Sequence, residues 1–503
     1  MLSRRAFTQA LAATLALPIS AKAERDDPAE VLAQSDAIGL AKYIASGRVT
    51  AKQVLRAAIE KADQLQPQLN FLAQDAKDYA YAALNTMPSG APLAGVPTLM
   101  KDLWLDMPGV PAENGSRFWA GNTPTVKSTL LKRYESAGLL PFGKTTSPEL
   151  GLTATTESVA TGLTRNPWNL DMTAGGSSGG AAVAVAAGGV PVAHASDGGG
   201  SIRTPASCCG VFGLKPSRGR VPLGPARTEG WLGLSTSHAI TRSVRDSALL
   251  LDISAGPDLG ARYHAPKPQR GSFLAATLEA PEPLKIALML SPPSGSAVHP
   301  DCLTAVRDVA DLCERLGHSV EEAAPSLDAK AINEAMLAVL TIETKITLDA
   351  RVAALGRPYG AEDVEPVTLW MAEMGAKQSP TAYAKANRVF QTAAIEVAKF
   401  MQGYDLILSP TLAKPPIELG RLGLSPTNFD AYVEDVTTFG PFTAWANQTG
   451  QPSMSVPLSW NEAGLPIGSM FTARYGDEET LFALAAQLEK ARPWFDKRPA
   501  LSV

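Results

Sequence analysis

The sequence has few of the residues that metal, redox or nucleic-acid chemistry requires. Its 503 residues include four cysteines and five histidines, and none stands in a C-x-x-C or H-E-x-x-H pattern. A zinc or dithiol site is therefore not predicted. The formal net charge is only −4, which gives no basic footprint for nucleic acid. We expect a protein that needs no metal and no other cofactor.

Long apolar runs are also missing. The run from Ala10 to Ile19 is shorter than the ~20 residues that cross a bilayer. It follows Arg4-Arg5 and precedes Ala21-Lys22-Ala23, and this order is typical of a twin-arginine export signal. Residues 1–23 are thus predicted to be a signal peptide, and the mature form is expected in the periplasm with no membrane segment.

Small residues, by contrast, are concentrated between Thr173 and Lys215. Ser177 and Ser201 each follow a pair of glycines in this stretch. Glycine lets the backbone adopt positive φ, and consecutive small residues can turn several N–H groups into one anion-binding concavity. A serine hydroxyl beside such a concavity favours acyl transfer, because the N–H groups can hold the developing oxyanion.

Helical and strand patterns alternate along the mature chain, which predicts an α/β fold. Residues 24–90 are expected to form a helical segment that packs on the core, and residues 91–503 a catalytic domain. Helices are expected at 29–40, 50–65, 73–85, 129–137, 180–188, 300–317, 380–402 and 480–491, and strands at 92–100, 139–144, 284–290, 404–408, 453–456 and 467–472.

Two common interpretations of the glycine loops fit poorly. Gly175–Gly179 matches the G-x-S-x-G elbow of α/β-hydrolases, but that fold needs an upstream oxyanion loop and a downstream acid and histidine. Here Gly198–Gly200 lies downstream, and His299 and His318 only flank a helical region. Gly138–Thr145 matches G-x-x-x-x-G-K-[ST], but its interior is strand-like, so we discount a phosphate-binding loop.

A lysine base fits better. Lys101 ends the apolar stretch 95–100, and desolvation there would lower its pKa toward neutrality, so that the amine could accept a proton. Ser178, Asp197 and Arg203 are expected to support the serine loops.

Six segments follow one another along the chain: Lys101-Asp102, Gly175–Gly180, Asp197–Arg203, 213–216, 450–453 and 464–468. In this order they resemble the amidase signature family, and the resemblance covers nearly the whole mature chain. Within the family, the segments 145–151, 165–169 and 194–210 look most like the 6-aminohexanoate-cyclic-dimer hydrolase branch.

The resemblance implies both a fold and a set of site residues. The fold would be one large mixed β-sheet of order ten strands, covered by helices on both faces. Ser201 would be the nucleophile, Ser177 a bridging serine on a cis peptide and Lys101 the neutral base. The oxyanion hole would be formed by the backbone N–H groups of Gly198, Gly199, Gly200 and Ser201, and backbone near Gly151 would contact the substrate.

The expected function is therefore hydrolysis of a small linear or cyclic carboxamide through an acyl-enzyme, with compounds like 6-aminohexanoate cyclic dimer among the candidates. A glutaminase-type subunit of an amidotransferase complex and a non-catalytic binding protein on the same scaffold are the alternatives. The expected partners are a small amide and, as one option, a second copy of the chain. Residues 341–349 and 442–447 are expected to shape the acyl pocket.

Overall fold

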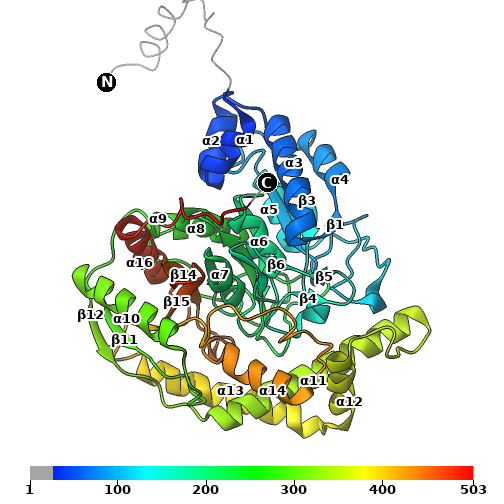
Figure 1. The fold of residues 1–503 in the computed structure, drawn as a ribbon, viewed down its shortest axis with the longest axis vertical. Helices are drawn as coiled ribbons and strands as arrows, with labels where there is room; N and C mark the ends of the chain where they lie inside the picture. Colours follow the sequence, from blue (N-terminus) through cyan, green and yellow to red (C-terminus); the bar gives the residue numbers. More distant parts are fainter. Residues whose placement is uncertain (1–25, 502–503) are drawn as a thin grey trace, which may run out of the picture.

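The computed structural model describes residues 26–501 and contains one mixed eleven-stranded sheet (Figure 1). Its strand order is β1-β3-β2-β8-β10-β9-β14-β15-β13-β11-β12. These strands are β1 (Leu72–Asp75), β2 (Pro97–Lys101), β3 (Leu140–Thr145), β8 (Val192–Asp197), β9 (Phe212–Lys215), β10 (Thr236–Thr241), β11 (Lys285–Leu288), β12 (Ser319–Glu322), β13 (Leu406–Pro410), β14 (Ser453–Trp460) and β15 (Pro466–Ala473). Two small ribbons add β4 (Glu157–Ser158) with β5 (Gly162–Leu163), and β6 (Arg165–Asn166) with β7 (Asn169–Thr173).

Helices cover both faces of the large sheet. Every residue of β2, β3, β10, β13 and β15 is buried, as expected for strands with a layer on each side. The helices are α1 (Pro28–Gln34), α2 (Ala37–Ala45), α3 (Ala51–Leu69), α4 (Lys77–Leu84), α5 (Thr129–Ser136), α6 (Gly179–Ala186), α7 (Arg203–Cys209), α8 (Val244–Ser254), α9 (Phe273–Ala276), α10 (Pro300–Arg315), α11 (Ala329–Leu355), α12 (Pro366–Lys377), α13 (Pro380–Phe400), α14 (Phe429–Phe439), α15 (Ala444–Thr449) and α16 (Glu478–Ala491), with short 3₁₀ turns at Arg117–Trp119 and Glu149–Gly151. The predicted fold class is confirmed.

The order of the strands places the carboxyl ends of β2, β3 and β8 at one edge of the sheet. β2 runs parallel to β3 on one side and to β8 on the other. Carboxyl ends of parallel strands point the same way, and ligands bind at such edges in α/β sheets. Lys101 ends β2 and Asp197 ends β8, so residues far apart in the sequence meet there.

The chain from α1 to α4 forms one end of the molecule in Figure 1, and α11 to α14 lie at the opposite end. The N-terminal helices are tied to the core by carboxylates. Asp246 in α8 accepts hydrogen bonds from the backbone N–H groups of Ala37 and Ile38, and Asp36 forms an ion pair with Arg245. Helix α3 starts with a capping box at Thr50.

Several sequence-based boundaries were wrong; the helix expected at 50–65 ends at Leu69 and the strand expected at 453–456 ends at Trp460, and three other differences have a visible cause or change an element. The single helix expected at 29–40 is two helices, because the chain turns at Ser35–Asp36 and the Asp36 carboxylate caps α2 through Gly39 N. The helix expected from residue 73 begins only at Lys77, because residues 72–75 pair with β3 and extend the sheet. The strand expected from residue 92 begins at Pro97.

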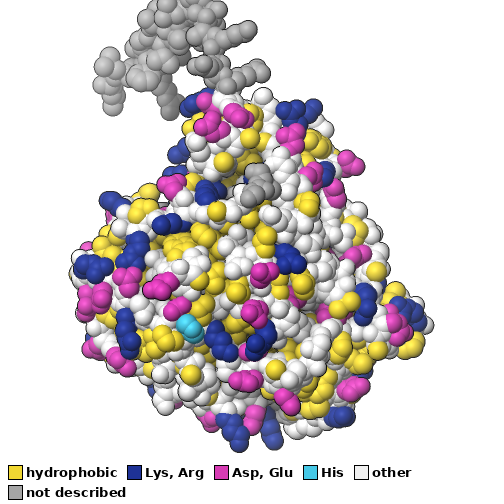
Figure 2. Space-filling model, viewed as in Figure 1, with side chains coloured by type: hydrophobic (Ala, Val, Ile, Leu, Met, Phe, Trp, Pro, Cys, Tyr) yellow, Lys and Arg dark blue, Asp and Glu magenta, His cyan; other side chains and the backbone are white. Residues whose placement is uncertain are grey.

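The exposed face in Figure 2 carries interspersed acidic and basic side chains rather than a patch of one sign. Within residues 26–501, the helices lack the combination of length and apolarity that spanning a membrane would take. All four cysteines are free and buried.

Candidate active site

The amine of Lys101 lies among three serine hydroxyls at the edge where β2 and β8 end. Its Nζ is 2.8 Å from Oγ of Ser177, 2.9 Å from Oγ of Ser178 and 3.1 Å from Oγ of Ser196. Ser177 and Ser178 belong to the loop before α6, and Ser196 belongs to β8. Lys101 is fully buried, so these hydroxyls replace the water that would otherwise solvate the amine.

The proton of one of these hydroxyls already has an acceptor. Ser178 Oγ donates to the carbonyl oxygen of Ser196 at 3.1 Å, so toward Lys101 this hydroxyl acts as an acceptor. The Ser177 hydroxyl, at the shortest distance from Nζ, is free to donate its proton to the amine. Ser178 therefore orients Lys101. Of the other two hydroxyls, that of Ser177 lies closer to Nζ than that of Ser196 and is the better placed to exchange a proton with the amine.

Burial lowers the pKa of Lys101 to about 7, and the charge of Asp197 only partly opposes this effect. The desolvated ammonium has no carboxylate directly against it, which is the situation in which a lysine becomes a base near neutral pH. His194 lies beside it and accepts the backbone N–H of Lys101 on Nδ1. Burial, together with the positive charge of Lys101, lowers the pKa of His194 to about 3, so this imidazole stays neutral.

Ser177 lies where two segments approach closely. The Gly176–Ser177 peptide is cis, as the family resemblance implied. A Cβ on Gly176 would stand 2.3 Å from the carbonyl oxygen of Thr155, so the position has no room for a side chain. Gly151 has φ +73°, and a Cβ there would stand 3.3 Å from Ser177 Oγ. The structure thus brings Gly151 against Ser177; its contact with substrate stays a prediction.

Ser201 lies in the turn between β8 and α7, and its carbonyl oxygen accepts the N–H of Ser178. Gly200 has φ +138°, a value that favours glycine, and its N–H donates to Oδ1 of Asp197 at 2.7 Å. That donor already has an acceptor, so Gly200 is a turn residue rather than a free oxyanion donor. Among the described residues, no backbone or side-chain acceptor takes the N–H groups of Gly198, Gly199 and Ser201.

Asp197 organises this turn. Its carboxylate accepts from Gly200 N and Ile202 N, forms a two-point ion pair with Arg203, and accepts from Nδ2 of Asn447. Asp197 and Arg203 are fully buried. Burial by itself would raise the pKa of Asp197, but the charge and hydrogen bonds of Arg203 hold it well below its usual range. The expected supporting roles of Asp197 and Arg203 are thus visible as contacts.

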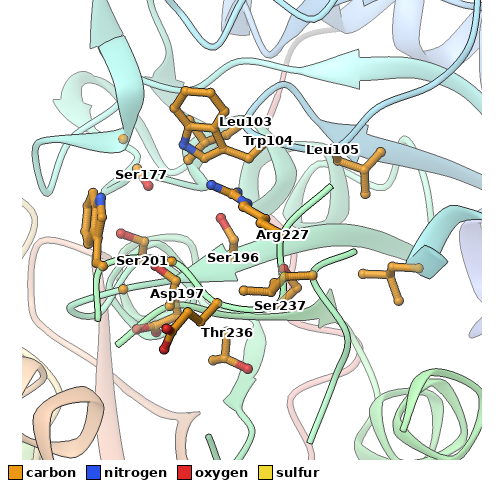
Figure 3. A pocket seen from close by; sticks show the side chains of 18 of the residues that line it. Leu103, Trp104, Leu105, Ser177, Ser196, Asp197, Ser201, Arg227, Thr236 and Ser237 are labelled. Carbon is orange, nitrogen blue, oxygen red and sulfur yellow. The ribbon is translucent and has the colours of Figure 1, made fainter. Parts of the chain in front are cut away.

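A cavity of about 160 Å³ opens beside these groups, and Figure 3 shows Ser177, Ser196 and Ser201 facing it. Trp104, Leu105, Leu150 and Trp231 supply apolar walls, and Glu343 and Thr347 of α11 also line it. The expectation for residues 341–349 is therefore met in part. Residues 442–447 do not line this cavity; Asn447 instead supports Asp197 and Arg203.

Several site residues were missed from the sequence. Ser196 and His194 lie in the segment 194–210 that carried the branch resemblance, but neither was given a role, because their contacts with Lys101 exist only when β8 is placed next to β2. The buried ion pair between Asp102 and Lys144, 2.7 Å long, joins the ends of β2 and β3. This pairing and the buried strand over Leu140–Thr145 support the rejection of the phosphate-loop interpretation. His299 caps α10 and His318 contacts Gln487, so neither serves Ser177.

A large mixed sheet, with a buried lysine between serines and a glycine turn beside a small cavity, defines a class of hydrolase that acts on carbon–nitrogen bonds. The family model described as Amidase matches residues 53–482. The chain therefore belongs to the amidase family, and it is an enzyme that hydrolyses amides.

Individual relatives cover nearly the whole chain. The chain is 34% identical over 479 residues to 6-aminohexanoate-cyclic-dimer hydrolase of Paenarthrobacter ureafaciens, with 93% of this chain and 96% of that protein aligned. A solved structure of 6-aminohexanoate cyclic dimer hydrolase matches with TM-score 0.88 and 32% identity over 93% of this chain and 99% of the other. A bacterial aryl acylamidase matches with TM-score 0.82 and 28% identity over 96% and 100%.

Removal of Arg203 should destabilise the turn. Arg203→Met leaves the Asp197 carboxylate buried without its cation, a change that costs about 3–5 kcal/mol of unfolding free energy. A lower denaturation midpoint and lower amidase activity are expected. Arg357→Met, which breaks an ion pair with a half-exposed arginine, should lower the midpoint far less, because solvent screens an exposed pair. Equal losses in the two variants would contradict this role of Arg203.

Proposed function

We propose that the enzyme cleaves small amides by a serine–serine–lysine relay in which Ser201 is the nucleophile. The observation that carries the proposal is the 2.8 Å contact between Lys101 Nζ and Ser177 Oγ, made by a fully buried lysine. Ser177 lies between this amine and the cavity that Ser201 also lines. Within residues 26–501, the histidine beside Lys101 is His194, and its pKa is too low for a base at neutral pH.

The relay moves two protons in one direction. Neutral Lys101 accepts the Ser177 proton, Ser177 accepts the Ser201 proton, and Ser201 Oγ bonds to the amide carbon. Ser177 then donates its proton to the leaving nitrogen while Lys101 returns a proton to Ser177. The carbon–nitrogen bond breaks, the amine departs, and an ester remains on Ser201. Water then attacks this ester by the same route and releases the acid.

The N–H groups of Gly198, Gly199 and Ser201 would hold the oxyanion of each tetrahedral intermediate. Gly200 contributes indirectly, because its bond to Asp197 fixes the turn. Loss of a single donor of this kind typically lowers kcat by about 10²–10³-fold. Gly151 would contact the substrate beside Ser177.

A small linear or cyclic carboxamide is the proposed substrate. Support comes from the small size of the cavity and from the relative named for 6-aminohexanoate cyclic dimer, which aligns over 96% of its length. Amine release from a panel of linear, cyclic and aryl amides would identify the preferred member. A homodimer stays a prediction.

Ser201→Ala should lower kcat by a factor on the order of 10⁴ or more while the fold is retained, because loss of a covalent nucleophile removes the acyl-enzyme route. A fluorophosphonate should label the wild type at Ser201 and leave the variant unlabelled. Ser294→Ala, in an exposed loop, is the control. Near-normal turnover by Ser201→Ala would move the nucleophile elsewhere, most simply to Ser177, and absence of labelling in the wild type would favour a non-catalytic protein.

The pH profile of kcat/KM should report Lys101. The amine must be neutral to accept a proton, so activity should rise with pH through about 7, the lowered pKa of this lysine, and reach a plateau in the alkaline range. Lys101→Ala should lose most activity together with this rise. Lys101→Arg should do no better, because a guanidinium stays protonated. An unchanged rise in Lys101→Ala would identify a different base.

Export through a twin-arginine signal is also proposed, on the sequence alone, since residues 1–25 lie outside the described residues. Arg4→Lys combined with Arg5→Lys should leave the precursor in the cytoplasm, whereas the wild-type periplasmic protein should begin near Glu24. Fractionation and N-terminal sequencing check both points. Exported, active protein that still begins with Met1 would contradict the signal-peptide assignment.

A further inference from the structure

The cavity has one positively charged side chain among its described lining residues, and it has no role in the relay. Arg227 lies in the segment between β9 and β10 and is the one arginine or lysine among the described residues that line the cavity. Figure 3 shows its guanidinium pointing into the space that Ser177, Ser196 and Ser201 face. It lies over the indole ring of Trp104, 5.1 Å from the ring centroid. Trp104 thus holds the arginine over the cavity.

The acidic groups that line the same cavity have donors of their own. Asp197 is paired with Arg203, Glu229 with Arg262, and the hydroxyl of Tyr383 donates to Glu343. Within residues 26–501, by contrast, Arg227 takes part in no ion pair or hydrogen bond. Its N–H groups therefore face the cavity without a protein acceptor.

Arg227 keeps its charge in this setting. Burial lowers its pKa to about 10, and the charges of Asp106 and Glu343 act in the opposite direction. The guanidinium is therefore protonated at neutral pH. A planar fork of N–H donors over an aromatic ring matches a carboxylate, which can accept two parallel hydrogen bonds. Because acidic side chains also lie nearby, a singly charged anion suits the position better than a dianion.

We propose that Arg227 binds a carboxylate of the substrate, so that the preferred substrates are small amides that carry a free carboxylate apart from the scissile bond. The proposal rests on the proposed amidase function and narrows it toward linear amides, since a cyclic dimer of an amino acid has no free carboxylate. The carboxylate could stand on the acyl side or on the amine side of the bond, and the test below separates these two sources.

The test compares matched substrates with the wild-type enzyme. On the acyl side, the mono-4-nitroanilides of succinic, glutaric and adipic acid are paired with their methyl esters. On the amine side, N-butanoyl-4-aminobenzoate is paired with its methyl ester. In one of the two arms kcat/KM should favour the carboxylate by about 10- to 100-fold, the range expected for a hydrogen bond between charged groups.

Variants then assign the preference to Arg227. Arg227→Met should bring the ratio of carboxylate to ester close to one, and Arg227→Lys should retain part of it, because lysine keeps the charge but not the fork. Arg388→Met, at an exposed position of α13, removes one positive charge elsewhere and should keep the wild-type ratio.

Two outcomes would overturn the proposal: a wild-type ratio near one in both arms, or a ratio that survives in Arg227→Met. The wild-type comparison decides the matter even if Arg227→Met fails to fold. Failure of the proposed function would look different, because neither the acids nor the esters would then be hydrolysed in a Ser201-dependent way.

Discussion

The chemistry of this enzyme depends on the desolvation of one amine. Lys101 ends a strand whose residues are all buried, and its neighbours are serine hydroxyls rather than a carboxylate. An ammonium ion in that place loses its water without gaining a counter-ion, so its pKa falls to about 7. His194, which lies beside Lys101, is neutral and therefore does not donate a proton to the amine. The sheet thus creates a base from a residue that is ordinarily protonated.

The carboxylate whose charge acts on the pKa of Lys101 is bound by other groups. Asp197 follows Ser196 on β8, yet its oxygens are taken by Arg203, Asn447 and the backbone of the turn. Had this carboxylate paired with Lys101, the amine would have remained charged. One buried ion pair therefore shapes the turn that presents Ser201 and also leaves the lysine free to act as a base.

Much of the site was predictable because its parts are local in sequence. The glycine pairs before Ser177 and Ser201 indicate tight backbone turns, which a short stretch of sequence is enough to predict. Lys101 likewise follows a short apolar stretch. Ser196, His194 and Arg227 were not predictable in this way, since each acquires its neighbours only from strand order and loop packing. Gly200 was predicted to donate its N–H to the oxyanion. The sequence does not show that the Asp197 carboxylate already accepts a hydrogen bond from this N–H group.

The sequence by itself determined the α/β class, the family resemblance and the residues proposed for the relay, because hydrophobic periodicity and glycine spacing act over short stretches. Helix boundaries near residues 29–40 and 73–85 were decided by tertiary structure, where a capping carboxylate and an open sheet edge outweighed local helical pattern. The pKa of Lys101 and the charge lining the cavity were also decided there. The pKa of Lys101 and the charges that line the cavity depend on which side chains pack together and exclude water. Tertiary packing decides this, and the order of residues in the sequence does not show it.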